Sequence, residues 1–354
     1  MRSVPRKTPT SHKFLRNSAA IVTRLGNFGV WLLFFYSVWF ALVFLVLDWE
    51  TVVSHWPIAA AMAGGSFVAG SSPVAGGAIG FPVLVFVFDH PANLGKTFAL
   101  AIQSVGMVSA SIYILSQRRK VEWRVLKYAL FGSAIAMPFG IFVIVPYLAD
   151  LWVKVLFSIL YGSFGLLHVL QLKSIMRSGH SAKSASEHDW KIGLAIGLIG
   201  GLLSSIVGVG ADILMYGMLV LYFRVDIKVA IPTAVILMAL TSLIGINCMM
   251  LSGFFWPTHA AALLQTLPYW VAAAPVVAVG APLGSLVARH VPRVGILMVV
   301  AVLCLFQFVW TCHREQIGGW SLAGVTMIVL VINLFLHLWL LQQKKSQSVS
   351  RLRG

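Results

Sequence analysis

Long apolar runs dominate the chain, and their lengths predict how it meets a membrane. A helix needs about 17 to 25 apolar residues to cross the hydrocarbon core. Runs of this length cover residues 31–48, 95–116, 125–148, 151–172, 228–252, 268–288, 294–312 and 320–341. The pattern therefore predicts an all-α polytopic membrane protein.

Two further apolar stretches, 57–89 and 192–223, are too long for one crossing. As a single helix, either would be about 50 Å long, against roughly 30 Å of hydrocarbon. Glycines interrupt both stretches. We therefore expect each to form a hairpin of two short helices, about sixteen residues each, that turns back inside the membrane.

The basic residues test this count independently. The chain has 26 Lys and Arg against 10 Asp and Glu, a net charge of +16. With two hairpins, every basic residue except Lys96, Lys154 and Arg314 falls on one side. Because cytoplasmic loops collect Lys and Arg, we expect a chain in the inner membrane with both termini in the cytoplasm. The same charge favours anionic lipid, so no nucleic acid partner is expected.

The composition and motifs exclude several classes of protein. The chain is 59% hydrophobic and 10% charged, which does not fit a soluble core. Cys248, Cys304 and Cys312 lie in or beside apolar runs, at no spacing typical of metal ligands or a disulfide framework. The sequence has no enzyme-like histidine or serine motif and no Walker motif. We therefore expect no catalysis, cofactor, metal or directly bound ATP.

The two hairpins are related in sequence. "SSPVAGGA" at 71–78 matches "SSIVGVGA" at 204–211 in five of eight positions, and "MPFG" later corresponds to "APLG". We therefore interpret residues 57–172 and 192–312 as two copies of one unit. The distribution of basic residues in the loops predicts that the first hairpin enters the membrane from the outside and the second from the cytoplasm. The two copies are therefore predicted to be inverted. Inverted repeats with broken helices are typical of secondary transporters whose substrate binds near the midplane.

Each predicted repeat consists of a Gly-broken hairpin and three transmembrane helices. Further segments precede, separate and follow the two repeats. From the N-terminus these are a basic cytoplasmic segment (1–30), an extra helix (31–48), repeat 1 (57–172), a cytoplasmic linker (173–191), repeat 2 (192–312), an extra helix (320–341) and a basic cytoplasmic tail (342–354). The sequence does not indicate an oligomeric state.

At these hairpins the sequence resembles the TauE/SafE family of sulfite and organosulfonate exporters, over about residues 57–312. That family carries two Gly-rich hairpins, each followed by a helix that begins near Ala and Thr. The corresponding residues here are Gly65, Gly70, Gly76, Gly77, Gly80, Pro82 and Thr97, then Gly197, Gly201, Gly208, Gly210, Gly217, Ala230, Pro232 and Thr233. The family's triple glycine is reduced to "AGGA" and "GVGAD". The resemblance implies export of sulfite, an organosulfonate or a related small oxyanion.

Such a substrate can be bound by helix N-termini and hydroxyl groups at the breaks. Glycines let the backbone approach the ligand closely. The candidate substrate-binding residues are Ser71, Ser72, Gly76, Gly77, Gln103, Ser104, Ser204, Ser205, Gly208, Gly210, Thr233 and Thr241. The alternative is that these small and polar residues serve only close helix packing and interhelical hydrogen bonds.

Asp212, in the second break, is the one acidic residue that the pattern places inside the membrane. It is a candidate proton carrier that would couple transport, or alternatively an N-cap of the helix that follows. We expect no Lys or Arg in mid-span, with Lys96, Arg224 and Lys228 at membrane rims.

Two other functions remain to be distinguished. A non-transporting membrane scaffold or assembly factor could keep a transporter fold, because fold alone does not fix function. In a transporter the polar residues of both hairpins should converge on one cavity, whereas in a scaffold they should pack separately. Uptake of a cation or metal would require clustered carboxylates, which Asp212 alone does not provide.

Overall fold

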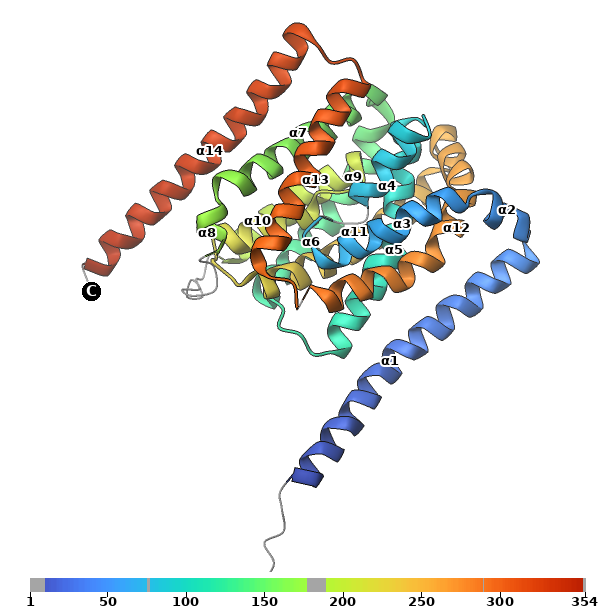
Figure 1. Cartoon of the computed structure of the whole chain (residues 1–354). Helices are drawn as coiled ribbons and strands as arrows, with labels where there is room; N and C mark the ends of the chain where they lie inside the picture. Colours follow the sequence, from blue (N-terminus) through green and yellow to red (C-terminus); the bar gives the residue numbers. More distant parts are fainter. Residues whose placement is uncertain (1–9, 75–76, 177–188, 289, 353–354) are drawn as a thin grey trace, which may run out of the picture.

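The computed structural model is helical throughout its regular structure (Figure 1). It describes residues 10–74, 77–176, 189–288 and 290–352. Nine helices in these ranges are long and apolar enough to span a membrane. They are Gly26–Leu45, Ala92–Ser116, Trp123–Tyr147, Asp150–Leu170, Asp189–Val207, Ile227–Ser252, Pro257–Val287, Arg293–Arg314 and Gly319–Leu338. The prediction of an all-α polytopic membrane protein is confirmed.

The first half of the chain contains a broken hairpin followed by three long helices. Its helices are α3 (Trp56–Ser71), α4 (Gly77–Pro82), α5 (Ala92–Ser116), α6 (Trp123–Phe139) and α7 (Asp150–Leu170). Helix α4 continues as a π-helical turn at Val83–Val87, after Pro82. Helix α6 likewise loosens into a π-helical turn just after Pro138. In both places the proline has no N–H for the regular hydrogen-bond ladder.

The second half has the same order of elements. Its helices are α9 (Asp189–Val207), α10 (Ala211–Leu221), α11 (Ile227–Ser252), α12 (Pro257–Val287) and α13 (Arg293–Arg314). The break between α9 and α10 contains Gly208 at φ 85° and Gly210 at φ 134°, which side chains with a Cβ rarely adopt. Because the break lies at these glycines, α9 has 19 residues, more than the sixteen or so expected for each leg.

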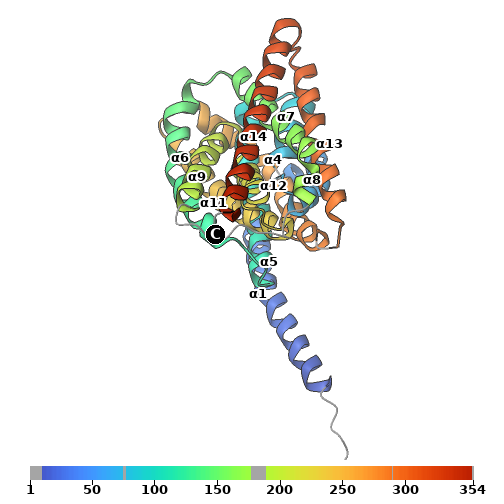
Figure 2. The same cartoon turned by 90° about the vertical axis from the view of Figure 1, so that its left-hand side faces the viewer.

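The outer helices α1 (Thr10–Leu45) and α14 (Gly319–Leu352) lie on opposite sides of the bundle (Figures 1 and 2). Trp39 Nε1 on α1 donates to the carbonyl of Val271 on α12 at 2.8 Å. Asn333 on α14 donates to the carbonyl of Ser163 on α7 at 3.2 Å. The remaining short helices are α2 (Trp49–Ser54) and α8 (Leu172–Met176).

Each long hairpin leg packs against a helix of the other half: α3 along α12, and α9 along α6. Glycines bring these backbones together. A Cβ at Gly70 would overlap the carbonyl oxygen of Ala281, and a Cβ at Gly197 would overlap that of Ala129. Helices α5 and α11 run between these pairs and are the most buried spans in the described chain.

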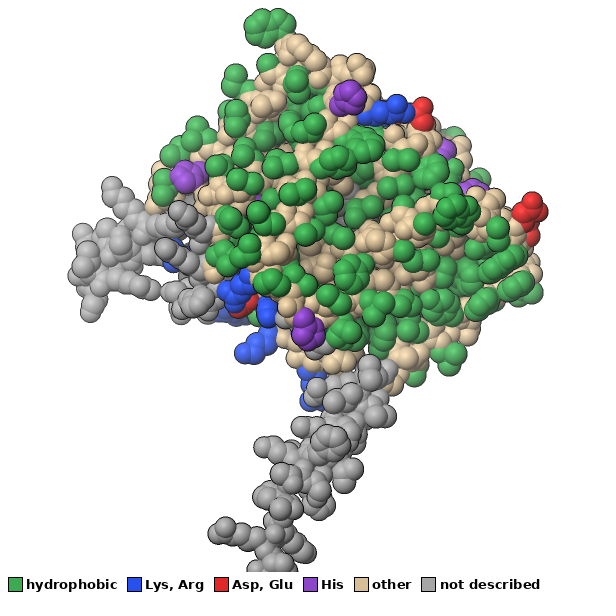
Figure 3. All heavy atoms as spheres, in the orientation of Figure 1, with side chains coloured by type: hydrophobic (Ala, Val, Ile, Leu, Met, Phe, Trp, Pro, Cys, Tyr) green, Lys and Arg blue, Asp and Glu red, His purple; other side chains and the backbone are tan. Residues whose placement is uncertain are grey.

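The two ends of the bundle differ in charge. Hydrophobic side chains cover the middle of the face seen in Figure 3, while Lys and Arg gather along its lower edge. We call the end where α5 finishes, with Arg119, Arg124 and Arg293, the basic end. The other end, where α5 begins beside Asp150, is called the far end; the N–H of Ala92 donates to that carboxylate at 2.5 Å.

Candidate functional site

The breaks of the two hairpins meet inside the bundle. Gly77, the first residue of α4, lies against Val209 of the second break and against Gln103 of α5. A Cβ at Gly77 would be 2.5 Å from Val209 Cγ1 and 2.5 Å from Gln103 Nε2. Gln103 Nε2 also donates to the carbonyl of Gly208 at 2.9 Å. Glycine is therefore required here for close approach, and Gln103 ties α5 to the second break.

The hairpins reach this meeting point from opposite ends. The first hairpin finishes near Asp89, which pairs with Arg314 at 2.8 Å at the far end. The second opens at the basic end, where Asp189 begins α9 and lies 4.0 Å from Arg124. Both breaks consequently lie within the bundle, where they can share one site.

A crevice joins polar residues of both breaks. Ser72 from the first break and Asp212 from the second are each 2% exposed. The crevice, called the central crevice below, is lined by Ala69, Ser72, Pro73, Met107, Asp212, Ala234, Val235 and Met238. These residues leave no space between them for a water molecule, so the crevice is closed.

Asp212 lies at the start of α10 and also lines the central crevice. It is the second residue of α10, and its Oδ1 accepts a hydrogen bond from the N–H of Gly210 at 3.2 Å. This bond stabilises the start of the helix, but the N-cap residue is Gly210, so the prediction of Asp212 as the N-cap is wrong. The same side chain lines the central crevice, as expected of a proton carrier that meets the substrate.

Two serine hydroxyls brace the breaks. Ser72 Oγ accepts from the N–H of Val74 at 3.3 Å, and Ser204 Oγ accepts from the N–H of Ala211 at 3.1 Å. The second bond spans the Gly208–Gly210 break and fixes the start of α10. With the Asp212 bond, it occupies two of the N–H groups that the sequence suggested for an anion.

Ser204→Ala is expected to lower the free energy of unfolding by about 0.5–2 kcal/mol, because the buried N–H of Ala211 loses its capping acceptor. Thermal unfolding of the purified protein in detergent measures the change. Ser104→Ala is the matched control, since Ser104 Oγ donates only to the carbonyl of Ala101 in its own helix. Equal melting temperatures for the two variants would contradict the capping role.

Several predicted residues do not line the crevice. Ser71, Ser104 and Ser205 donate to carbonyls of their own helices, those of Val68, Ala101 and Leu202. Ser205 is packed instead against Gly140, where a Cβ would overlap its Oγ.

The two threonines are also separate from the crevice, and one glycine cannot be placed. Thr233 Oγ1 accepts from the N–H of Glu122 at 3.0 Å and so holds the loop at the basic end. Thr241 is buried, and its hydroxyl has no partner in the described ranges. Gly76 lies outside the described residues. The structure thus brings together Ser72, Gly77, Gln103, Ser204, Gly208, Gly210 and Asp212 at or beside the breaks.

A small basic pocket lies next to the central crevice. It has a volume of about 30 Å³ and is lined by Arg119, Lys228 and Arg293, together with Gly70 of the first hairpin. Ile231 of α11 also lines it, about one helical turn before crevice residues of that helix. We call this pocket the basic mouth. Its basic residues come from the ends of three helices, α5, α11 and α13, that are far apart in the sequence. The sequence therefore showed them only as basic residues of separate loops.

The burial of Lys96 was also missed, since the sequence analysis expected this residue at a membrane rim. It lies in the second turn of α5 and is 2% exposed. The available signal was its isolation, because it is one of only three basic residues outside the predicted cytoplasmic segments.

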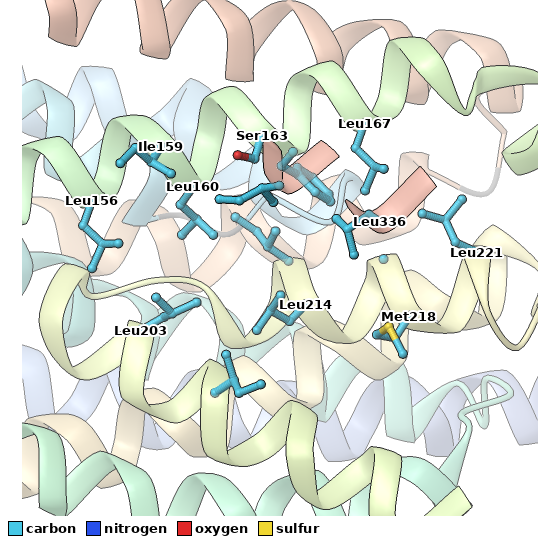
Figure 4. A pocket seen from close by; sticks show the side chains of 15 residues that line it. Leu156, Ile159, Leu160, Ser163, Leu167, Leu203, Leu214, Met218, Leu221 and Leu336 are labelled. Carbon is cyan, nitrogen blue, oxygen red and sulfur yellow. The ribbon is translucent and has the colours of Figure 1, made fainter. Parts of the chain in front are cut away.

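A larger pocket of about 330 Å³ lies between α7, α9, α10 and α14 (Figure 4). Leucine, isoleucine, phenylalanine and methionine side chains surround it, and Ser163 brings the only side-chain hydroxyl of its lining. An anion in such a lining would lose its hydration without gaining hydrogen bonds. This pocket therefore does not suit an oxyanion.

The family comparison covers the part of the chain that holds both hairpins. A model of the family described as sulfite exporter TauE/SafE matches residues 57–311. Comparisons with curated proteins and with solved structures gave no match. The matched range includes both broken hairpins, the helices from α5 to α12 and most of α13, and it leaves out α1 and α14. With both halves of the site inside a match over most of its length, the chain belongs to the TauE/SafE sulfite exporter family of membrane transporters.

Proposed function

We propose that this chain is a secondary exporter that carries sulfite, a small organosulfonate or a related oxyanion across the inner membrane. The observation that carries the proposal is the meeting of the breaks, with Gly77 against Val209 and both Ser72 and Asp212 at the central crevice. A scaffold would have no need to bring polar residues of both hairpins to one place. Convergence therefore favours transport.

The architecture proposed for this function is a pair of inverted repeats, residues 57–172 and 192–312. The opposite entry of the two hairpins supports it, as does the reciprocal packing of α3 on α12 and α9 on α6. We take the basic end as cytoplasmic, because Lys and Arg accumulate on that side. Both termini are then in the cytoplasm.

In this mechanism the basic mouth attracts the anion from the cytoplasm, since Arg119, Lys228 and Arg293 line it. The anion next enters the central crevice beside Ser72. An ionised Asp212 would repel it there, whereas a protonated Asp212 can donate a hydrogen bond to an oxyanion. The proton and the anion therefore move outward together.

The central crevice is closed in this structure, so transport requires helices to move. Backbone contacts at glycine hold α3 to α12 and α9 to α6. These two pairs rock against each other and open the crevice first to the basic end and then to the far end, in the alternating access that inverted repeats perform.

Transport by the purified full chain in proteoliposomes tests the proposal. Vesicles loaded with sulfite, methanesulfonate or sodium chloride are diluted, and loss of each solute is followed against protein-free vesicles. The expected result is saturable efflux of sulfite or methanesulfonate without chloride or sodium. Absence of efflux for sulfite and for a panel of short sulfonates would favour the scaffold.

Asp212→Asn is expected to remove the response of transport to a pH gradient. Wild-type efflux of methanesulfonate, which stays a monoanion near neutral pH, should rise when the interior is made acidic, because one proton leaves with each anion. That process moves no net charge, so voltage should have little effect on it. In the variant, efflux should ignore the pH gradient and respond to voltage, at about 2.3 kcal/mol per 100 mV for each charge. Wild-type efflux that ignores the pH gradient at fixed voltage would refute the coupling role.

A further inference from the structure

Lys96 is a basic residue buried inside the bundle. Its side chain is 2% exposed, although it is in a membrane-spanning helix. Within the described ranges, no carboxylate forms an ion pair with it. Burying an uncompensated charge is costly, and buried charges are normally paired or bind a ligand. Lys96 therefore needs an explanation that packing does not supply.

Polar groups at the start of α12 lie against the first turn of α5, next to the turn that carries Lys96. Asn93, one turn before Lys96, donates through Nδ2 to the carbonyl of Thr258 at 3.3 Å. This bond joins the first turns of α5 and α12, so Lys96, one turn further along α5, and His259, the residue after Thr258, lie at the same end of the bundle. His259 is 1% exposed. Asn93 Oδ1 is buried and has no partner in the described chain.

His259 presents one ring nitrogen to this space. Its Nδ1 lies 2.8 Å from Ser252 Oγ, and that hydroxyl donates to the carbonyl of Met249 at 2.9 Å. Since the serine hydrogen is already used, Nδ1 must carry the hydrogen of the His259–Ser252 bond. No partner is found for Nε2 among the described residues. Nε2 can accept a hydrogen bond from a protonated ligand when the ring is neutral, or donate a hydrogen bond when the ring is charged.

Lys96 also contacts the second break. A Cβ at Gly208 would lie 2.9 Å from the carbonyl oxygen of Lys96, so the two backbones touch. Lys96 and Gln103 are seven residues apart and share one face of α5. The Lys96 cluster thus lies beside the meeting point of the breaks, displaced along α5 toward the far end.

We propose that Lys96, His259 and Asn93 form a second anion-binding site, which receives the oxyanion after the central crevice and before release at the far end. This inference rests on the proposed function and adds Lys96, through its ammonium group, to the residues that bind the anion. One ammonium group can neutralise one negative charge, and His259 and Asn93 supply hydrogen-bonding groups. The site therefore takes monovalent oxyanions, such as hydrogen sulfite or a sulfonate, in preference to sulfate.

Ligand-dependent thermal unfolding of the purified full chain tests this site. Methanesulfonate is the monovalent probe and sulfate the divalent one. In the wild type, methanesulfonate should raise the melting temperature at lower concentration than sulfate. Lys96→Met should melt no lower than the wild type without ligand, because a buried unpaired charge is removed, and should bind methanesulfonate at least tenfold more weakly. Lys127→Met, on the exposed face of α6, is the control and should bind as the wild type does.

Two further variants keep the test decisive if Lys96→Met does not fold. Lys96→Arg retains the charge and should keep part of the affinity, while His259→Gln should weaken methanesulfonate binding severalfold. Wild-type affinity in Lys96→Met, or in His259→Gln when Lys96→Met is unfolded, would overturn the second site. Proteoliposome efflux separates the two proposals: wild-type transport with an unchanged KM in Lys96→Met removes the second site alone, whereas absence of wild-type transport removes the proposed function.

Discussion

Gly197→Ala is expected to lower the free energy of unfolding by about 3 kcal/mol or more, at the upper end of what overpacking a core costs. The added Cβ would overlap the carbonyl oxygen of Ala129, which belongs to the backbone of α6. A side chain could rotate away from such an overlap, but a helix backbone cannot. The two helices must separate, and in lipid their close packing is the main source of attraction.

Thermal and denaturant unfolding in mixed micelles measures this loss, together with the yield of monodisperse protein. Gly217→Ala, on α10, is the matched control, because nothing lies within 4 Å of the position of its Cβ. Gly217→Ala should equal the wild type or exceed it slightly, since alanine favours helix more than glycine does. A Gly197→Ala protein as stable as Gly217→Ala would show that α6 and α9 are not in close contact.

Gln103→Leu is expected to lower both stability and transport. The carbonyl of Gly208 would lose the donor that it now has 2.9 Å away, and Gly208 is buried. Leaving such an acceptor unsatisfied costs about 1–3 kcal/mol. The break would also lose its connection to α5, so we expect the initial rate of methanesulfonate efflux to fall at least tenfold.

Asn247→Leu is the control for the Gln103 variant. Asn247 Nδ2 donates to the carbonyl of Leu243 in its own helix, on an exposed face of α11. Its loss should leave the melting temperature and the efflux rate close to wild-type values. If Gln103→Leu behaves in the same way, the hydrogen bond to Gly208 has no role in holding the two halves of the site together.

The membrane crossings and the interrupted hairpins could be predicted because they follow from one physical length. A run near twenty apolar residues fits the hydrocarbon, and stretches such as 57–89 do not. The positions of the breaks also followed from local chemistry, since Gly208 and Gly210 adopt backbone conformations that other residues avoid. These features depend on short segments of chain, which a single sequence displays directly.

The direction in which each polar side chain points could not be predicted in the same way. Ser71 and Ser72 are adjacent, yet only Ser72 lines the central crevice, because α3 ends between them. Along α5 and α11 apolar residues cover every face, so hydrophobicity does not reveal which face is inside. Lys96 was likewise assigned by its distance from the helix start, whereas its burial depends on α12, more than 150 residues later in the chain.

The reciprocal pairing of α3 with α12 and of α9 with α6 has a consequence for how the molecule is assembled. The long leg of each hairpin makes its most extensive contact with a helix of the opposite half, so neither of the two proposed repeats is expected to be stable alone. During synthesis the glycine surface of α3 in the first hairpin stays uncovered until its partner helix α12 has been made. If the chain is divided near the linker, each fragment should accordingly be degraded when it is produced alone. Both fragments should be stable when they are produced together.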